Sequence, residues 1–263
     1  MASKHDELTR SEFESFEIDE QVSELIKKIE REHPDLDKKE IQILDWGCGR
    51  GRTVLKLLRE GYTAYGVEID EDVMKNGYPL FEIYDCNPEK YLYHIDDIKT
   101  FQENSFHLII TEQVLEHVED IHHVIGEHSR LTTSGGFGFH SFPATKMIKE
   151  VHLRMPFVHW FPKNSIRRYW IALMLLLSFK PKKVWPETVD KSFWETVDIY
   201  YNYMNQKTFY RDIRHLFDLL DRYGFDVSYY NRHPKKSVWN LLPDFLSMNG
   251  FPKRTGRLVV QKR

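Results

Sequence analysis

Acidic residues stand at the ends of three short apolar segments in this 263-residue chain, where they could bind one small ligand together. Asp45 precedes a turn with glycines at 47, 49 and 51, Glu68 ends a second segment, and Asp96 with Asp97 ends a third. A glycine turn lets the backbone approach a ligand closely, whichever nucleotide is bound. The acid before the turn says more about the class of ligand than the glycines do, because it repels a pyrophosphate and attracts an ammonium group.

These charges together suit an aminoacyl nucleoside. The Asp45 carboxylate can bind an ammonium group, while the N–H groups that begin the following helix can bind a carboxylate. Glu68 can accept hydrogen bonds from both hydroxyls of a ribose, and Asp96 or Asp97 can accept one from an adenine amino group. We therefore expect S-adenosylmethionine as the cofactor and disfavour a nicotinamide dinucleotide. The competing interpretation of each acid is a helix cap or an ordinary loop residue.

A series of motifs resembles that of the class I S-adenosylmethionine-dependent methyltransferases. It is most similar to their small-molecule branch, which includes the ubiquinone and menaquinone methyltransferases. The motifs are Ile43–Gly51 (ILDWGCGRG), Val67–Asp70 (VEID), Asn104–Ile110 (NSFHLII) and Val114–Val118 (VLEHV). The resemblance covers residues 40–140.

This resemblance implies roles for individual residues. The turn after Asp45 would line the methionine end, Glu68 would hold the ribose, and Glu112 with Gln113 would flank the sulfonium. The implied cofactor-binding residues are Asp45, Trp46, Gly47, Cys48, Gly49, Glu68, Ile69, Asp96, Asp97, Glu112 and Gln113. Glu116 and His117 open the helix after the fourth strand in that family, which implies packing and capping for them rather than catalysis.

Alternating strand and helix patterns must position these residues. Apolar side chains at i, i+3, i+4 and i+7 predict a helix from Val22 to Ile29 that ends near Pro34 and covers a sheet edge. The predicted strands are 41–45, 64–69, 91–95, 106–111 and 136–140, and two later ones, 225–230 and 257–261, could close the sheet as an antiparallel edge. Strands separated by helices pair in parallel. The expected fold is therefore α/β, with a doubly wound, mostly parallel, Rossmann-like sheet.

We expect one domain over residues 1–263, with a helical insertion after the fifth strand. Its expected parts are an acidic, solvated N-terminal arm and helix (1–40), a cofactor-binding core (41–140), a helical cap (141–224) and closing strands (225–263). Ligands of open α/β sheets bind at the carboxyl edge of the strands. The insertion is therefore the candidate acceptor site.

Histidines are the candidate general bases, because imidazole titrates near neutral pH. They are His140 at the end of the fifth strand, and His152 and His159 in the insertion. Each could instead be structural. We expect no metal site, since Pro156 interrupts the seven-residue spacing that would place His152 and His159 on one helical face.

The insertion is strongly basic and partly apolar. Residues 144–183 hold nine bases and one acid, although the whole chain has a net charge of −3, which favours an anionic acceptor or surface. Within it, residues 169–179 are apolar on all sides, but as a helix they rise only about 16 Å and cannot span a bilayer. They could be buried beneath the cap, or lie in a membrane interface or against a lipid-like acceptor.

The expected function is therefore methyl transfer from S-adenosylmethionine to a small or lipid-linked acceptor, anionic ones included, with O-methylation favoured over N or C. The alternative is a non-catalytic regulatory or scaffolding subunit with the same fold. A charged N-terminus, only two cysteines and no long apolar run predict a cytoplasmic protein. Residues 167–183 are the candidate for peripheral membrane contact, and no nucleic-acid-binding module is recognised.

Overall fold

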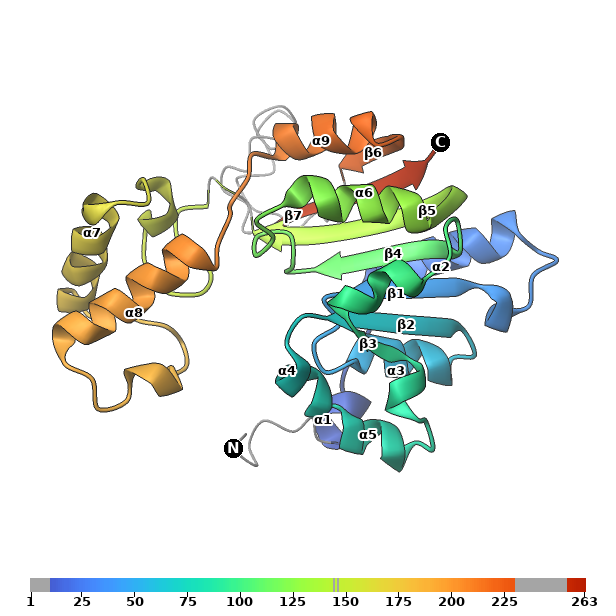
Figure 1. The fold of residues 1–263 in the computed structure, drawn as a ribbon, viewed down its shortest axis with the longest axis horizontal. Helices are drawn as coiled ribbons and strands as arrows, with labels where there is room; N and C mark the ends of the chain where they lie inside the picture. Colours follow the sequence, from blue (N-terminus) through green and yellow to red (C-terminus); the bar gives the residue numbers. More distant parts are fainter. Residues whose placement is uncertain (1–9, 144, 146, 230–254) are drawn as a thin grey trace, which may run out of the picture.

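A seven-stranded sheet forms the centre of the protein (Figure 1). The computed structural model describes residues 10–143, 145, 147–229 and 255–263. The strands are β1 Gln42–Trp46, β2 Thr63–Glu68, β3 Leu92–His94, β4 Phe106–Glu112, β5 Thr132–Pro143, β6 Phe225–Tyr229 and β7 Thr255–Lys262. They lie in the order β3-β2-β1-β4-β5-β7-β6, and β7 runs antiparallel to β5 and β6. The predicted α/β class is confirmed, although β7 lies inside the sheet and β6 forms its edge.

Helices cover both faces of this sheet, which explains why β1 is buried from Ile43 onward. On one face, α1, α2, α3 and α5 pack with Ile43 and Leu108; on the other, α6 and α9 pack with Leu44 and Ile109. The helices are α1 Arg10–Glu14, α2 Glu20–Glu32, α3 Arg52–Arg59, α4 Glu71–Lys75, α5 Tyr78–Ile83, α6 Ile121–Leu131 and α9 Ile213–Arg222. The 3₁₀ segments of this part are η1 Lys38–Glu40, η2 Pro88–Lys90 and η3 Ile95–Thr100.

Two N-terminal features differ from expectation. Helix α2 contacts the central strands β4 and β5, so it covers a face of the sheet rather than an edge. Phe13 of α1 is buried in the core, although the acidic arm around it reads as solvated. One large apolar side chain is enough to anchor this short helix against α5 and its neighbours.

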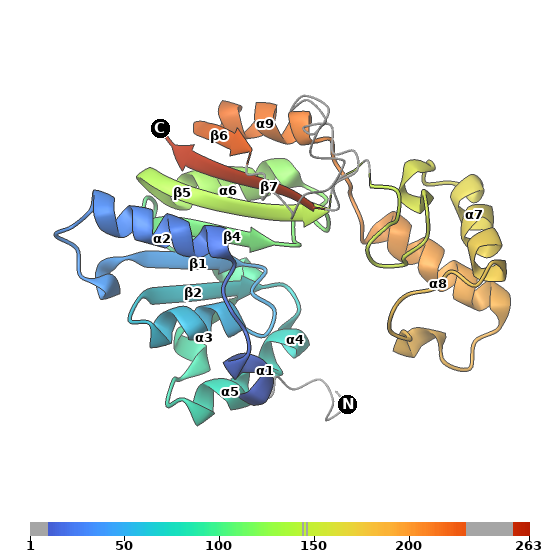
Figure 2. The same ribbon diagram turned by 180° about the vertical axis from the view of Figure 1, so that it is seen from behind.

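A separate helical unit follows β5. It consists of η4 Val158–Trp160, α7 Ser165–Leu176, η5 Pro186–Thr188 and α8 Phe193–Gln206. Its helices pack around a core of their own, which includes Leu153, Ile171 and Val197. Figures 1 and 2 show the unit extending outward from the carboxyl ends of the strands. Across the described ranges, no helix is both long and apolar enough to cross a membrane.

Candidate active site

Glycines shape the turn between β1 and α3, at the carboxyl end of the sheet. Gly47, Gly49 and Gly51 have φ values of 79°, 54° and 72°, which residues with a side chain rarely adopt. The N–H groups of Gly47 and Cys48 donate to the Val67 carbonyl at 2.8 and 3.0 Å. A Cβ atom at Gly49 would meet nothing within 4 Å, so the main chain there borders open space. The turn offers a ligand bare backbone, as predicted.

Asp45 lines a cavity of about 330 Å³ beside this turn. It is only 5% exposed, and Glu112 lines the same cavity. Burial raises the pKa of Asp45 to about 7, together with repulsion from Glu112 and Glu68, while a hydrogen bond from Thr53 opposes the rise. Burial also raises the pKa of Glu112. A cationic group in this cavity would relieve the repulsion, so these residues fit the ammonium group of an aminoacyl ligand.

Glu68 ties the end of β2 to the glycine turn. Its carboxylate accepts hydrogen bonds from the N–H groups of Gly49 at 2.9 Å, Ile69 at 2.8 Å and Asp70 at 3.1 Å. A carboxylate has about four acceptor positions, so roughly one is left for a ribose hydroxyl. Accepting from both hydroxyls, as the sequence suggested, therefore requires one of these N–H groups to move away.

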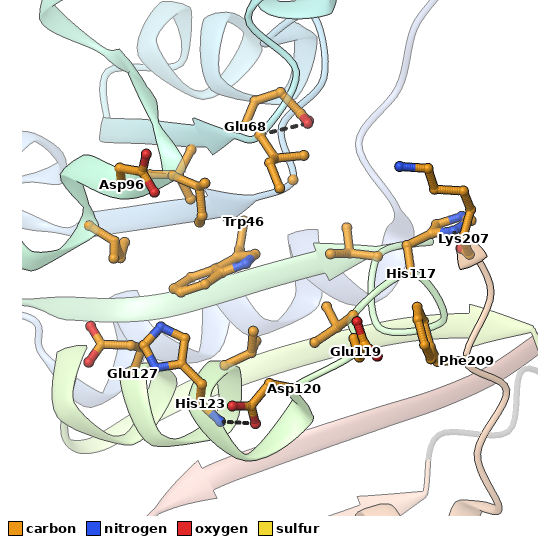
Figure 3. A pocket seen from close by; sticks show the side chains of 18 of the residues that line it. Trp46, Glu68, Asp96, His117, Glu119, Asp120, His123, Glu127, Lys207 and Phe209 are labelled. Carbon is orange, nitrogen blue, oxygen red and sulfur yellow. Dashed lines mark hydrogen bonds between the residues drawn. The ribbon is translucent and has the colours of Figure 1, made fainter.

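Figure 3 shows a larger cavity of about 820 Å³. It adjoins the first one, because Gly47 lines both. We call the two cavities together the cleft. Of the predicted cofactor residues, the larger cavity is lined by Trp46, Gly47, Glu68, Ile69, Asp96 and Gln113, and the smaller by Asp45, Gly47, Cys48, Gly49 and Glu112. Asp97 lines neither cavity. Ile69 is 74% exposed, and with Ile95 and Ile98 it gives the larger cavity an apolar wall suited to a base.

One end of the larger cavity is lined by two residues that the sequence did not single out, Lys207 and Phe209, and by His117, which was expected only to pack or cap a helix. Lys207 and Phe209 follow α8, and His117 faces them from the loop after β4 (Figure 3). They lie about a hundred positions apart along the chain, so no local pattern could have joined them.

The three histidines predicted as general bases lie in different places. His140 is buried, with Nδ1 2.8 Å from the Thr111 hydroxyl oxygen and its ring stacked on that of His128. Burial lowers its pKa to about 4, and it does not line the cleft, so it is not placed to meet an acceptor there. His159 lines a different cavity of about 320 Å³. His152 lines neither cavity of the cleft, but its ring lies beside that of His117, which lines the larger one.

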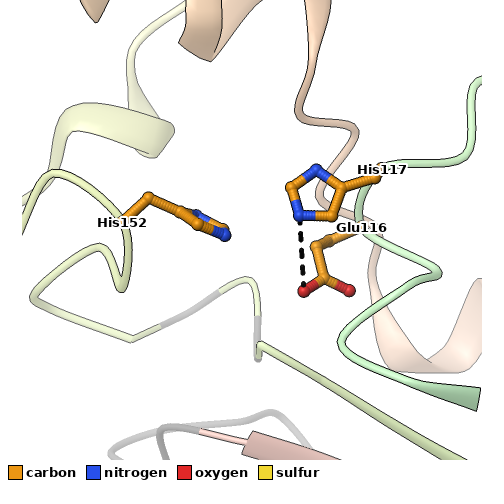
Figure 4. Close-up of side chains that lie close together, drawn as sticks. All are labelled: Glu116, His117 and His152. Atoms are coloured by element: carbon orange, nitrogen blue, oxygen red, sulfur yellow. Dashed lines mark ion pairs between the residues drawn. The ribbon is translucent and has the colours of Figure 1, made fainter. Parts of the chain in front are cut away.

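Glu116 and His117 belong to the loop between β4 and α6. The side chain of His152, which follows β5, lies beside them (Figure 4). Helix α6 begins at Ile121 and its N-cap is Asp120, so neither residue caps it, contrary to expectation. Glu116 is 3% exposed, and no other described residue donates a hydrogen bond to its carboxylate. Burial raises its pKa to about 7. His117 Nε2 lies 3.9 Å from Glu116 Oε1, and the His117 and His152 ring centroids are 5.1 Å apart.

Several bases of the helical unit hold that unit together. Lys163 and Arg167 donate to backbone carbonyls, and Arg168 pairs with Asp198 at 2.5 Å. The local positive charge is therefore only partly available to an acceptor. Lys163, Arg167 and Arg211 also line the 320 Å³ cavity, whose described lining includes no acid.

Comparisons with known proteins show the family and the fold. The chain matches a family described as methyltransferase domain over residues 17–229. A comparison with curated protein sequences finds no match. An S-adenosylmethionine-dependent methyltransferase from Mesorhizobium loti superposes with a TM-score of 0.51 at 14% identity, over 88% of this chain and 95% of that one. One from Methanosarcina mazei has a TM-score of 0.51 at 17% identity, over 88% and 96%.

A third solved structure is phosphoethanolamine N-methyltransferase 2 of Haemonchus contortus in complex with S-adenosyl-L-methionine. Its TM-score is 0.51 at 11% identity, and the alignment covers 91% of this chain and 52% of that one. At such identities the likeness shows a shared fold.

Proposed function

This chain belongs to the methyltransferase-domain family, and we propose that it methylates a hydroxyl group of a small or lipid-linked acceptor. By family and fold it is an S-adenosylmethionine-dependent methyltransferase. When bound, S-adenosylmethionine supplies a methyl group that its sulfonium already activates. The protein must therefore bind the donor, align the acceptor and exclude water.

We propose that the smaller cavity holds the methionine end and the larger cavity the nucleoside. Asp45 would bind the ammonium group, Glu68 a ribose hydroxyl, and Ile69 with Asp96 the adenine. Glu112 lines the smaller cavity, and Gln113, its neighbour in the chain, lines the larger one. That position supports their proposed place on either side of the sulfonium.

The proposal that oxygen is the methyl acceptor rests on the polar cluster of Glu116, His117 and His152. As the acceptor oxygen bonds to the methyl carbon, the carbon–sulfur bond breaks and its electron pair stays on sulfur. The hydroxyl proton must also leave. A neutral amine attacks without first losing a proton, so it needs no such group. Carboxylate and imidazole groups at the acceptor end of the cleft therefore favour O-methylation.

An assay of S-adenosylhomocysteine release tests this proposal on a panel of hydroxyl, amine and carbon acceptors, each in water-soluble and lipid-linked form. We expect turnover with hydroxyl acceptors and a product that carries a new methyl ether. Turnover confined to amine or carbon acceptors would contradict it. The cationic cavity of Lys163, Arg167 and Arg211 supports including phosphorylated members of the panel.

The exposed face of α7 supports a lipid-linked acceptor, and we propose that it rests on an anionic membrane surface. Tyr169, Leu176 and Leu177 are 61%, 71% and 58% exposed, while the opposite side of the helix packs into the core of the unit. Exposed Lys182 and Lys183 follow the helix. An apolar stripe beside lysines suits a negatively charged lipid interface.

Vesicle co-sedimentation tests this surface. The protein should bind phosphatidylglycerol vesicles more tightly than phosphatidylcholine vesicles, and L176D/L177D should lose that binding. The control is I83D, because Ile83 is also an exposed aliphatic residue, at 54%, but lies on α5 away from the helical unit. Equal binding by L176D/L177D and the wild-type protein would refute the membrane contact without touching the assignment of the cofactor.

A further inference from the structure

We infer that Glu116, His117 and His152 bind one divalent transition-metal ion through a carboxylate oxygen and two imidazole nitrogens. One potential ligand atom from each residue lies within 4.8 Å of the others. Figure 4 shows the three side chains converging from two separate loops. Zinc bound at about 2.0–2.2 Å would draw such atoms to roughly 3.5 Å from one another, which side-chain rotation alone could supply.

The hydrogen bonds of both histidines leave one nitrogen free on each ring. His117 Nδ1 lies 2.5 Å from the carbonyl oxygen of Lys207, which can only accept, so Nδ1 carries the proton. His152 Nδ1 lies 2.6 Å from Glu150 Oε1 in the same way. Both Nε2 atoms then hold lone pairs. A metal-bound histidine typically has its other nitrogen bonded to a carbonyl or carboxylate.

The surroundings of Glu116 are a second, independent observation that points to a bound cation. Its carboxylate is almost fully buried, and neither oxygen receives a hydrogen bond from another described residue. A buried carboxylate without a partner is costly. A divalent cation would supply that partner.

Glu150 has the contacts of an outer-shell residue. It is fully buried and accepts hydrogen bonds from His152, from the Leu153 N–H and from the Tyr210 hydroxyl. The hydrogen bond to Glu150 fixes the orientation of the His152 ring and makes its Nε2 a better ligand.

This site differs from the one that the sequence argued against. That site would have paired His152 with His159, which the structure places on another cavity. His117, from a distant loop, is the second histidine ligand of the proposed ion instead. Because His117 also lines the larger cavity, the open coordination positions of the ion would face the acceptor end of the cleft.

A hydroxyl oxygen bound to the ion would lose its proton to solvent more readily. This consequence rests on the proposed O-methylation, whereas binding of the ion does not.

Titration of the chelator-treated, full-length protein with Co²⁺ tests the site, read by the visible absorption of the bound ion. We expect one equivalent to bind and excess Zn²⁺ to displace it. E116Q and H152N should abolish binding. E150Q should keep one equivalent with an affinity about 10- to 100-fold lower, as expected for an outer-shell change. H122N is the matched control, because His122 is exposed on α6 and outside the cluster, and it should bind as the wild type does.

Absence of saturable Co²⁺ binding by the wild-type protein would overturn the inference, as would unchanged binding by both E116Q and H152N. Calorimetry with S-adenosylhomocysteine on the same samples shows that each variant is folded. It also separates the two proposals: nucleoside binding without Co²⁺ binding overturns the metal site alone, whereas Co²⁺ binding without nucleoside binding overturns the proposed function.

Discussion

Replacing Asp45 with asparagine should stabilise the ligand-free protein and weaken its binding of the cofactor. Asp45 is buried, and its pKa rises from 3.8 to about 7 in the fold. The folded state therefore holds this proton more tightly than the unfolded state, so the free energy of unfolding falls as the pH rises from about 4 to 7. At 1.36 kcal/mol for each pKa unit, ionised Asp45 costs up to about 4 kcal/mol at pH 8.

Asparagine keeps the shape of the side chain and removes its charge. We expect D45N to be more stable than the wild type by about 2 to 4 kcal/mol at pH 8, and by less than about 1 kcal/mol at pH 4, where wild-type Asp45 is protonated. Urea denaturation at both pH values measures the difference. D35N, at an exposed acid outside the cleft, should shift neither value.

Binding should change in the opposite direction. A hydrogen bond to a charged group contributes about 1.5 to 3 kcal/mol, so D45N should bind S-adenosylhomocysteine roughly 10- to 150-fold more weakly by calorimetry. Gain of stability with loss of affinity would be a trade-off between stability and function. A stability difference that does not depend on pH, or unchanged affinity, would refute the reasoning.

The remaining predictions concern Glu68 and His140. E68A should weaken S-adenosylhomocysteine binding at least about tenfold and also destabilise the glycine turn. E68Q keeps one acceptor oxygen, so it should lose less affinity and less stability than E68A. Equal losses of calorimetric affinity in the two variants would contradict the hydrogen-bonding role. His140 has its pKa lowered from 6.5 to about 4 by burial, so the unfolded state binds its proton first and stability falls as the pH drops from about 6.5 to 4. H140Q should therefore lose about 3 kcal/mol less over that range in urea titrations, with methyl transfer retained, and an unchanged pH profile would contradict the buried neutral imidazole.

Local patterns in the sequence were enough to predict which acids lie beside the glycine turn. The glycine turn, the acid before it and the acid ending the next strand lie within 24 consecutive residues, and parallel pairing of β1 with β2 brings Asp45 and Glu68 to one edge. Asp97 shows the limit of such reasoning. It directly follows Asp96 in η3, but of these two acids only Asp96 lines the cleft.

The proposed acceptor end of the cleft, around His117, depends on contacts between distant segments. Glu116 and His117 meet His152 only because the helical unit returns its first loop to the end of β4, and nothing in the hydrophobic periodicity of either segment encodes that return. Phe13 is a similar case, since burial of one aromatic residue outweighs the acidic composition around it. The adjacent Glu116 and His117 were the one available signal, and helix capping was the wrong explanation for them.

A crystal structure of the complex with S-adenosylhomocysteine tests the central claim most directly. We expect its amino group within hydrogen-bonding distance of Asp45, its ribose at Glu68 and its sulfur between Glu112 and Gln113. Density for the nucleoside anywhere outside the cleft, or an amino group turned away from Asp45, would contradict the account.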